Sequence, residues 1–252
     1  MTARPLLAVV PARGGSKGLP GKNIRPLAGL PLLAHSVLCA RMTPVVDHLV
    51  VSTDDPGIAG VASQYAADVV HRPAALAEDH TPMWPVIQHA LRAVEQTDGR
   101  EYASVLLLDP TSPGRLPSDI AAAVALLESA DGCDGVVGVS IPEFNPLWHC
   151  VVDKGGFMRV LIPGADRYTR RQDVPTVYCI NATLYCWRRD FVLSATDWRA
   201  GDLKMCVVPN ERAVHIDTEE QFALTDLRLR HHLLQFPWLA SEALSPEALR
   251  SR

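Results

Sequence analysis

The residues with the clearest chemical potential lie between positions 11 and 23, where the chain reads Pro-Ala-Arg-Gly-Gly-Ser-Lys-Gly-Leu-Pro-Gly-Lys-Asn. Glycines let backbone N–H groups approach a phosphate closely, and successive N–H groups form a concave anion site. Three cations, Arg13, Lys17 and Lys22, can neutralise a triphosphate, and the first acidic residue of the chain is Asp47. The segment therefore predicts a phosphate-binding loop, in which Lys22 and Asn23 come late enough to reach a base or an α-phosphate.

Two common nucleotide-binding motifs are absent from this loop. It lacks the Gly-Lys-Ser/Thr ending of a Walker A loop, and no G-x-G-x-x-G fingerprint is present. A P-loop kinase and a dinucleotide-binding protein are therefore disfavoured.

The charge distribution supports a local anion site. The 252 residues include 24 basic and 28 acidic side chains, for a net charge of −4. Residues 1–46 hold six of the basic residues and none of the acidic ones, which leaves 18 basic and 28 acidic residues in the rest. This asymmetry favours a cationic segment on an acidic body, although chance and solubility are an alternative explanation. A nucleic-acid partner is not expected, because such proteins are usually basic overall.

Cysteine usage and hydropathy point to a cytoplasmic protein. None of the six cysteines has C-x-x-C spacing, and no histidine pair completes a zinc site. No apolar run approaches the ~20 residues that a membrane span needs, and the run at residues 6–10 is too short for a signal peptide. We expect reduced thiols and no membrane association.

Apolar segments alternate with amphipathic ones along most of the chain. The apolar segments lack a clean two-residue alternation, which is typical of parallel strands covered on both faces. The order predicts a doubly wound, mostly parallel, Rossmann-like α/β sheet, which binds ligands at the carboxyl ends of its strands. The loops 11–23, 53–56 and 109–115 all follow strands and should open on that edge. We predict strands at residues 6–10, 48–53, 68–70, 104–108, 135–140, 178–187 and 213–216, and helices at 31–42, 58–67, 85–96, 118–130 and 218–234.

The pattern changes twice after residue 140. Residues 142–178 have weaker periodicity and contain two apolar stretches around Asp-Lys-Gly-Gly at 153–156, which predicts a β-hairpin. We interpret residues 142–178 as an insertion in a single domain spanning residues 1–235. Residues 236–252 are expected to form a loose C-terminal tail.

The loop at 11–23 resembles the signature loop of the acylneuraminate cytidylyltransferases, the CMP-sialic acid synthetases, in the nucleotide-diphospho-sugar transferase superfamily. The resemblance covers about residues 5–235 in order. It continues through Val-Ser-Thr-Asp at 51–54, His-Arg-Pro-Ala-Ala-Leu-Ala-Glu-Asp at 71–79, Pro-Thr-Ser-Pro at 110–113, Arg-Gln at 171–172, Asn181 and Ile-Asp-Thr-Glu at 216–219.

This resemblance implies a nucleotidyltransferase that converts CTP and a small acidic acceptor into a CMP-conjugate and pyrophosphate. Lys22, Arg13 and Lys17 would be catalytic, with Lys22 stabilising charge on the α-phosphoryl group. The family is usually dimeric, and residues 142–178 would form the dimerisation arm. The nucleotide-binding set implied by the resemblance is Arg13, Gly14, Gly15, Ser16, Lys17, Lys22, Asn23, Arg72 and Asp79.

Two carboxylates are candidates for the Mg²⁺ that accompanies CTP. Asp217 matches the family's magnesium-binding aspartate, although Asp217 with Glu220, or Thr218 with Gln221, also fits a helix N-cap. Asp109 stands where sialate enzymes mostly have Gln, and His215 stands where they have Asp. We therefore predict that Asp109 and Asp217 flank one or two Mg²⁺ ions, with a turn-forming role as the alternative for Asp109.

The acceptor side departs further from the sialate pattern. Arg171 matches the arginine that pairs with the acceptor carboxylate, with a solvated basic loop as its alternative. Asn181 matches an Asn-Gly-Ala acceptor motif, but Ala182 and Thr183 follow it here. Cys179 replaces an arginine found in one branch, and Gly114 interrupts the usual Pro-Leu-Arg.

These departures leave several functions open. The acceptor could be a sialic-type nonulosonic acid, including a legionaminic or pseudaminic type, or a smaller acid such as a phosphonate. Trp84 and Trp148 could line its pocket, or belong to a core or an interface. A non-catalytic nucleotide-binding regulator on the same fold would be favoured if Lys22 or Asp217 were missing, and both are present.

Overall fold

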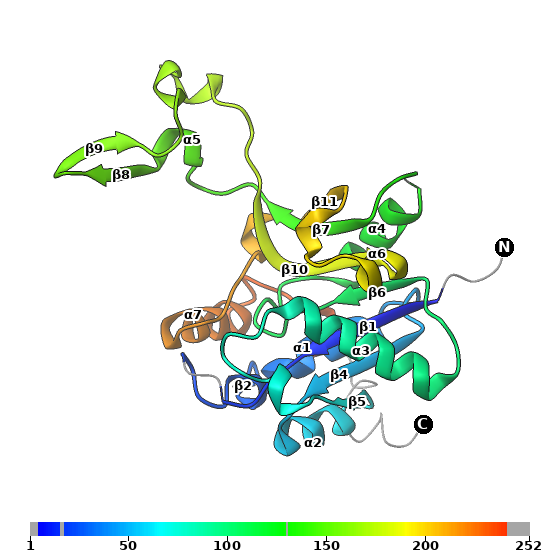
Figure 1. The fold of residues 1–252 in the computed structure, drawn as a ribbon. Helices are drawn as coiled ribbons and strands as arrows, with labels where there is room; N and C mark the ends of the chain where they lie inside the picture. Colours follow the sequence, from blue (N-terminus) through cyan, green and yellow to red (C-terminus); the bar gives the residue numbers. More distant parts are fainter. Residues whose placement is uncertain (1–4, 16–17, 130, 241–252) are drawn as a thin grey trace.

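A seven-stranded sheet forms the centre of the molecule (Figure 1). A computed structural model describes residues 5–15, 18–129 and 131–240. The strand order is β11-β7-β10-β6-β1-β4-β5, and only β10 runs antiparallel to its neighbours. The strands of this sheet are β1 (Leu6–Pro11), β4 (His48–Thr53), β5 (Asp68–His71), β6 (Ser104–Leu107), β7 (Gly135–Ser140), β10 (Cys179–Arg188) and β11 (Leu203–Val207). Two further pairs of strands are separate from it, β2 (Pro26–Leu27) with β3 (Leu30–Pro31) and β8 (Val151–Lys154) with β9 (Phe157–Val160).

Helices cover both faces of the sheet, as predicted. Along β1, Leu6, Ala8 and Val10 join a core with α1, α2, α4 and α7, whereas Leu7 and Val9 face α3 and α6. Successive side chains of a strand point to opposite faces, so a strand buried twice is apolar at every position. The helices are α1 (Leu32–Arg41), α2 (Pro56–Gln64), α3 (Met83–Asp98), α4 (Pro117–Glu128), α5 (Pro146–His149), α6 (Arg189–Ser194) and α7 (Glu219–Arg230).

The predicted strand at residues 213–216 is wrong. This segment is irregular, and the Ile216 N–H donates to the Thr111 carbonyl at 2.8 Å. Arg212 pairs with Asp119 at the start of α4 and anchors the segment there instead of in a strand ladder. The central sheet instead contains a strand that was not predicted, β11, a short edge strand whose Met205 is half exposed.

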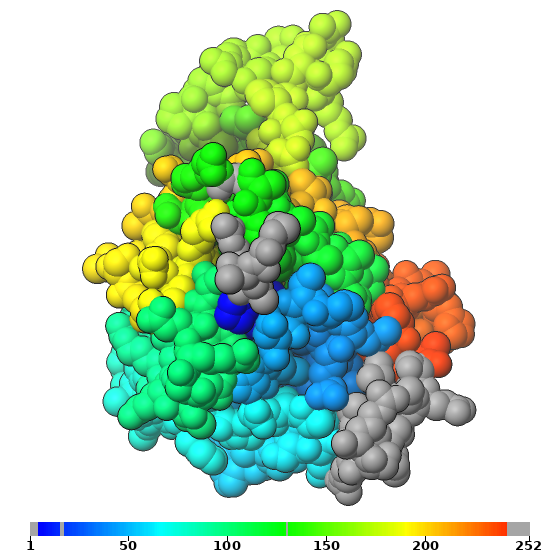
Figure 2. Space-filling model, turned by 90° about the vertical axis from the view of Figure 1, so that its right-hand side faces the viewer, coloured from blue at the N-terminus to red at the C-terminus, as the bar shows by residue number. Residues whose placement is uncertain are grey.

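The β8–β9 hairpin confirms the predicted turn. Val151 pairs with Val160, and Gly155 and Gly156 both adopt positive φ, as a two-residue hairpin turn of type I′ requires. The hairpin and α5 extend away from the sheet, to which residues 141–145 and 161–178 connect them (Figures 1 and 2). We call residues 142–178 the arm.

The start of the predicted loose tail is packed against the domain. Phe236 and Trp238 are buried, and the Trp238 indole N–H donates to His35 Nδ1 at 3.0 Å. Burial lowers the pKa of His35 to about 4, so the ring is neutral at pH 7 and its Nδ1 can accept this bond. The prediction of a tail beginning at 236 is therefore corrected for residues 236–240, and residues 241–252 lie outside the described part of the chain. Among the described residues, no helix has the length and apolarity needed to cross a membrane.

Candidate active site

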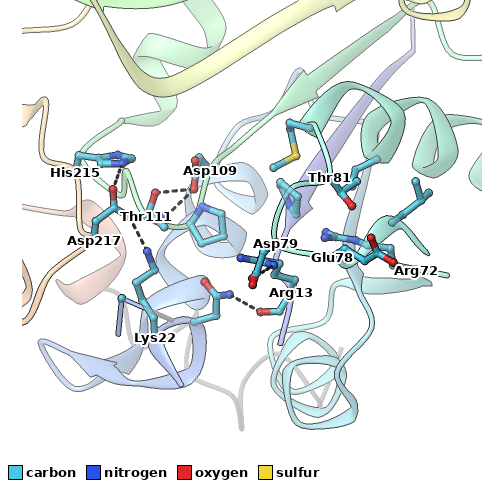
Figure 3. Close-up of a pocket in the computed structure, with 17 residues that line it drawn as sticks. Arg13, Lys22, Arg72, Glu78, Asp79, Thr81, Asp109, Thr111, His215 and Asp217 are labelled. Carbon is cyan, nitrogen blue, oxygen red and sulfur yellow. Dashed lines mark hydrogen bonds and ion pairs between the residues drawn. The ribbon is translucent and has the colours of Figure 1, made fainter. Parts of the chain in front are cut away.

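The loops at the carboxyl ends of β1, β5 and β6 enclose a cavity of about 610 Å³, together with the segment before α7 (Figure 3). The loop after β4 lines an adjoining hollow with Gly14 and Gly15. The prediction that these loops open on one edge of the sheet is confirmed. The cavity is lined by Pro11, Arg13, Gly18, Lys22, Asn23, Arg72, Leu76, Glu78, Asp79, Thr81, Met83, Val86, Asp109, Pro110, Thr111, His215 and Asp217.

Lys22 begins a short 3₁₀ helix (Lys22–Ile24) directly after Gly21, which adopts a left-handed conformation. Its ammonium group lies 2.9 Å from Asp217 Oδ1 and donates to the Ile216 carbonyl at 2.8 Å. The residue is 8% exposed. Gly18 allows the loop to approach the same segment, since an added Cβ would lie 2.9 Å from the Asp217 carbonyl oxygen. One ion pair thus joins the candidate phosphate-binding loop, through Lys22, to the candidate metal ligand Asp217.

Asp217 is held by two side chains. Lys22 contacts its Oδ1, and His215 Nε2 lies 2.8 Å from its Oδ2. His215 Nδ1 in turn lies 2.8 Å from the Ser112 hydroxyl oxygen (Figure 3 shows the chain from His215 to Lys22). Burial alone would raise the pKa of Asp217, but hydrogen bonds and charge from Lys22 and His215 outweigh burial and hold its pKa below the ordinary value.

The two alternatives for the start of α7 are resolved by its capping bonds. The Thr218 side chain accepts from the Gln221 N–H at 3.2 Å, and Gln221 Oε1 accepts from the Thr218 N–H at 3.0 Å. This is a capping box built by Thr218 and Gln221. The Asp217 carboxylate is therefore not needed as the cap of α7.

Two arginines bring positive charge to the other side of the cavity. Arg72 is 7% exposed and donates to the Ser52 carbonyl at 2.7 Å, and none of the described carboxylates forms an ion pair with it. Burial lowers the pKa of Arg72, and repulsion from Arg13 adds to this, while Asp54 opposes it. Arg13 pairs with Asp79 at 2.7 Å. Two guanidinium groups that repel each other and line one cavity form a site suited to an anion.

The remaining predicted nucleotide-binding residues lie around the same loop. The Asn23 amide donates to the Arg13 carbonyl at 3.1 Å and so fixes the two ends of the loop together. The Gly14 N–H already donates to Asp54 Oδ1 at 3.0 Å, and Gly15 adopts a left-handed conformation that suits glycine. Ser16 and Lys17 lie outside the described residues.

Asp109 forms a turn and also lines the cavity. Its Oδ1 accepts from the Thr111 N–H at 2.9 Å and from the Thr111 hydroxyl at 2.8 Å, which makes it a turn former. It also lines the cavity together with Asp217. Among the described residues, no three His, Cys, Asp or Glu side chains gather closely enough to hold a metal by themselves. Two carboxylates without a full protein cage fit Mg²⁺, which keeps several waters and usually takes one or two carboxylates plus substrate phosphates.

The structure does not bring Arg171 or Asn181 into the lining of the cavity. Arg171 is exposed and begins a 3₁₀ turn (Arg171–Asp173) in the arm. Asn181 lies at an irregularity in β10, where its Oδ1 accepts from the Thr183 hydroxyl at 2.7 Å and its buried Nδ2 has no partner among the described residues. Ala182 adopts a φ of 56°. A left-handed conformation costs a non-glycine residue roughly 1–2 kcal/mol, which explains why glycine suits this position of the motif.

The two tryptophans considered for the pocket lie elsewhere. Trp84 is buried, and its ring packs edge-on against Trp187 with 5.1 Å between the centroids, so it belongs to the core. Trp148 is in α5 of the arm and is partly exposed.

Sequence reasoning missed three residues that support the site. His215 was noted only as the replacement of an aspartate, although it bonds to Asp217. Ser112 was noted only as part of the Pro-Thr-Ser-Pro motif, although it bonds to His215. Arg115 also appeared only in a motif, and no local signal shows that it bonds to the distant residues Ser36 and Thr183. The position of His215, two residues before Asp217 and just before α7, was the signal that its side chain could contact the aspartate.

The comparisons with known proteins decide the family. A family model described as cytidylyltransferase matches residues 7–176. The chain belongs to this cytidylyltransferase family. The enzyme is 34% identical over 225 residues to CMP-N,N'-diacetyllegionaminic acid synthase of Legionella pneumophila, covering 88% of this chain and 94% of that protein. It is 30% identical over 219 residues to N-acylneuraminate cytidylyltransferase of Streptococcus agalactiae, covering 86% of this chain and 51% of the relative.

The fold of this cytidylyltransferase is shared with a solved structure of CMP:2-keto-3-deoxy-manno-octonic acid synthetase complexed with CTP. The TM-score is 0.65 at 18% sequence identity, and the match covers 89% of this chain and 100% of that one. The similarity confirms the mostly parallel Rossmann-like sheet.

Proposed function

We propose that this cytidylyltransferase transfers CMP from CTP to a sialic-type nonulosonic acid of the legionaminic class. The observation that carries the proposal is the ion pair between the buried Lys22 and the more exposed Asp217, which joins the cationic loop to the segment before α7 inside one cavity. The acceptor class is supported by the Legionella relative, named as a diacetyllegionaminic acid synthase, which aligns over 94% of its length. The comparisons give no support to a phosphonate acceptor.

In the proposed reaction, a hydroxyl oxygen of the sugar acid attacks the α-phosphorus of CTP. The bond from the α-phosphorus to the bridging oxygen breaks, pyrophosphate leaves with that electron pair, and the hydroxyl proton passes to solvent. Negative charge grows on the phosphoryl oxygens. Lys22, Arg13 and Arg72 line the cavity and would stabilise this charge with groups that are already in place.

Mg²⁺ is part of the proposal. Asp217 and Asp109 would hold it, with the remaining ligand positions supplied by phosphates and water. When bound, the ion would neutralise charge on the CTP phosphates. Asp217 Oδ1 and Oδ2 bond to Lys22 and His215, and this keeps the carboxylate oriented and ionised for that role.

The substrate assignment is tested by pyrophosphate release. The enzyme is mixed with each of the four NTPs against legionaminic-type, pseudaminic-type and neuraminic acids, an eight-carbon keto sugar acid and a small phosphonate. We expect release only with CTP, and fastest with a legionaminic-type acid. Preferential turnover of the phosphonate would contradict the acceptor class, and no release with CTP and any acid would contradict the reaction.

A homodimer formed through the arm is also proposed. The arm carries exposed apolar side chains, including Phe144, Phe157 and Met158. Exposed apolar patches of this kind are typical of surfaces that bind another protein. Arg171 lies on the arm and outside the cavity lining. In this proposal, Arg171 of one copy contacts the acceptor that is bound in the cavity of the other copy. Light scattering should give twice the chain mass at micromolar concentration, and aspartate at Phe157 and Met158 should shift the mass towards that of one chain. A monomeric wild-type protein would contradict the proposal.

A further inference from the structure

Arg115 is the most deeply buried charged residue among those the structure describes, with no exposed surface. It follows the Pro-Thr-Ser-Pro motif and precedes α4. No described carboxylate forms an ion pair with it, and burial lowers its pKa to about 10, so it remains charged at neutral pH. An unpaired buried charge is costly unless hydrogen bonds satisfy it. Its bonding partners therefore show what this guanidinium stabilises.

Each partner of Arg115 is a neutral oxygen, and three of them are backbone carbonyls. One terminal nitrogen donates to the Ser36 hydroxyl on α1 at 2.8 Å. The other donates to the carbonyls of Asp109 and Ser112, the second at 2.6 Å. Nε donates to the Thr183 carbonyl in β10.

These three carbonyls belong to two segments, the loop after β6 and strand β10. Asp109 lines the cavity, and Ser112 begins the chain of bonds that runs through His215 and Asp217 to Lys22. Thr183 bonds to Asn181, the residue of the predicted acceptor motif. One planar group thus joins the loop after β6, the irregular part of β10 and the body of the domain. Lysine could not replace it, because an ammonium group lacks the rigid fork of five donors.

We propose that Arg115 is a positioning residue for cytidylyl transfer. It fixes the loop 109–112 and the irregular part of β10 that contains Asn181 in a constant position relative to the Lys22–Asp217 pair. It does not line the cavity, so it acts through these residues and not on the substrate. The role rests on the proposed function of the cavity. In the proposed function, CTP is bound mainly by Arg13, Arg72 and Lys22, which Arg115 does not contact, whereas the alignment of acceptor and metal would depend on the loop 109–112 and on Asn181.

The test is Arg115→Lys, measured for thermal stability, CTP affinity and pyrophosphate release. We expect an unchanged Kd for CTP, a raised KM for the acceptor and a kcat lowered by roughly 10- to 100-fold, since small misplacements near reacting groups cost about that much. A purely structural residue would lower the amount of folded enzyme and leave both KM and kcat of the folded fraction unchanged.

The matched control is Arg188→Lys. Arg188 also donates to backbone carbonyls, those of Cys133 at 2.7 Å and Leu127 at 2.8 Å, but it ends β10 beside the start of β6, at the opposite edge of the sheet from the cavity. We expect it to lose stability without a change in kcat or acceptor KM. Ser36→Ala, which removes only the α1 anchor of Arg115, should reproduce the acceptor effect in weaker form.

Wild-type kcat and acceptor KM in Arg115→Lys would overturn the positioning role. If that variant does not fold, wild-type kinetics in Ser36→Ala would overturn it instead. The assay uses whichever acid the acceptor panel identifies. A different acid would therefore contradict only the proposed substrate class, and unaffected variants would contradict only the role of Arg115.

Discussion

Replacing Lys22 with alanine should lower kcat for pyrophosphate release by ~10²–10³-fold, the usual cost of losing one group that stabilises transition-state charge. The ammonium group is buried, so its charge acts in a medium that screens it weakly. Its removal also leaves Asp217 with His215 as its remaining side-chain partner. A discontinuous assay for pyrophosphate, with circular dichroism to verify folding, measures the effect.

Arg25→Ala is the control for this prediction. Arg25 follows the same loop and pairs with Glu219 at the start of α7, next to the segment that Lys22 contacts, but it does not line the cavity. It should change kcat little, because Arg25 does not line the cavity. Stability should also change little, since an exposed ion pair contributes little to it. Near-normal turnover in Lys22→Ala would contradict the placement of the active site, and an equal loss in Arg25→Ala would show that only the loop conformation matters.

The sheet and the position of the cavity were predictable because they depend on local patterns. Strands buried on both faces are apolar throughout, as in β1, and loops that follow parallel strands must share one edge. The sequence alone therefore predicts that Arg13, Lys22 and Asp109 lie at the same edge of the sheet. Family resemblance added Asp217, whose segment precedes α7 and has no strand of its own.

Features that depend on distant contacts were not predictable. Residues 213–216 have the apolar content of a strand, but Arg212 bonds to Asp119 and the Gly114 carbonyl, which places the segment against the loop after β6. An added Cβ at Gly114 would lie 1.8 Å from the Arg212 carbonyl oxygen, so this approach depends on glycine. Two of the four partners of Arg115, Thr183 and Ser36, are likewise 68 and 79 residues away. Such bonds leave no periodic trace in the sequence.

Asp217→Asn should lower kcat by roughly 10- to 100-fold and raise the Mg²⁺ concentration for half-maximal rate, because an amide keeps the shape of the carboxylate and loses its charge. Asp217 is the partner of Lys22 and lines the cavity, and we propose it as a metal ligand as well. The kcat alone cannot separate them, whereas the Mg²⁺ titration can. Asp109→Asn should also shift the Mg²⁺ titration, with a loss of about tenfold, if Asp109 shares the ion.

Asp226→Asn provides the matched control, because Asp226 is a carboxylate of α7 that bonds to the Ala28 N–H at 2.7 Å and pairs with Arg230, away from the cavity lining. It should lose stability without a change in the Mg²⁺ titration. A lower kcat in Asp217→Asn with an unshifted titration would contradict the metal role and leave Asp217 as the partner that orients Lys22. A shift in Asp217→Asn but not in Asp109→Asn would restrict Asp109 to the turn that it forms with Thr111. The two aspartates can thus be assigned separately, since each has its own set of bonds in the same cavity.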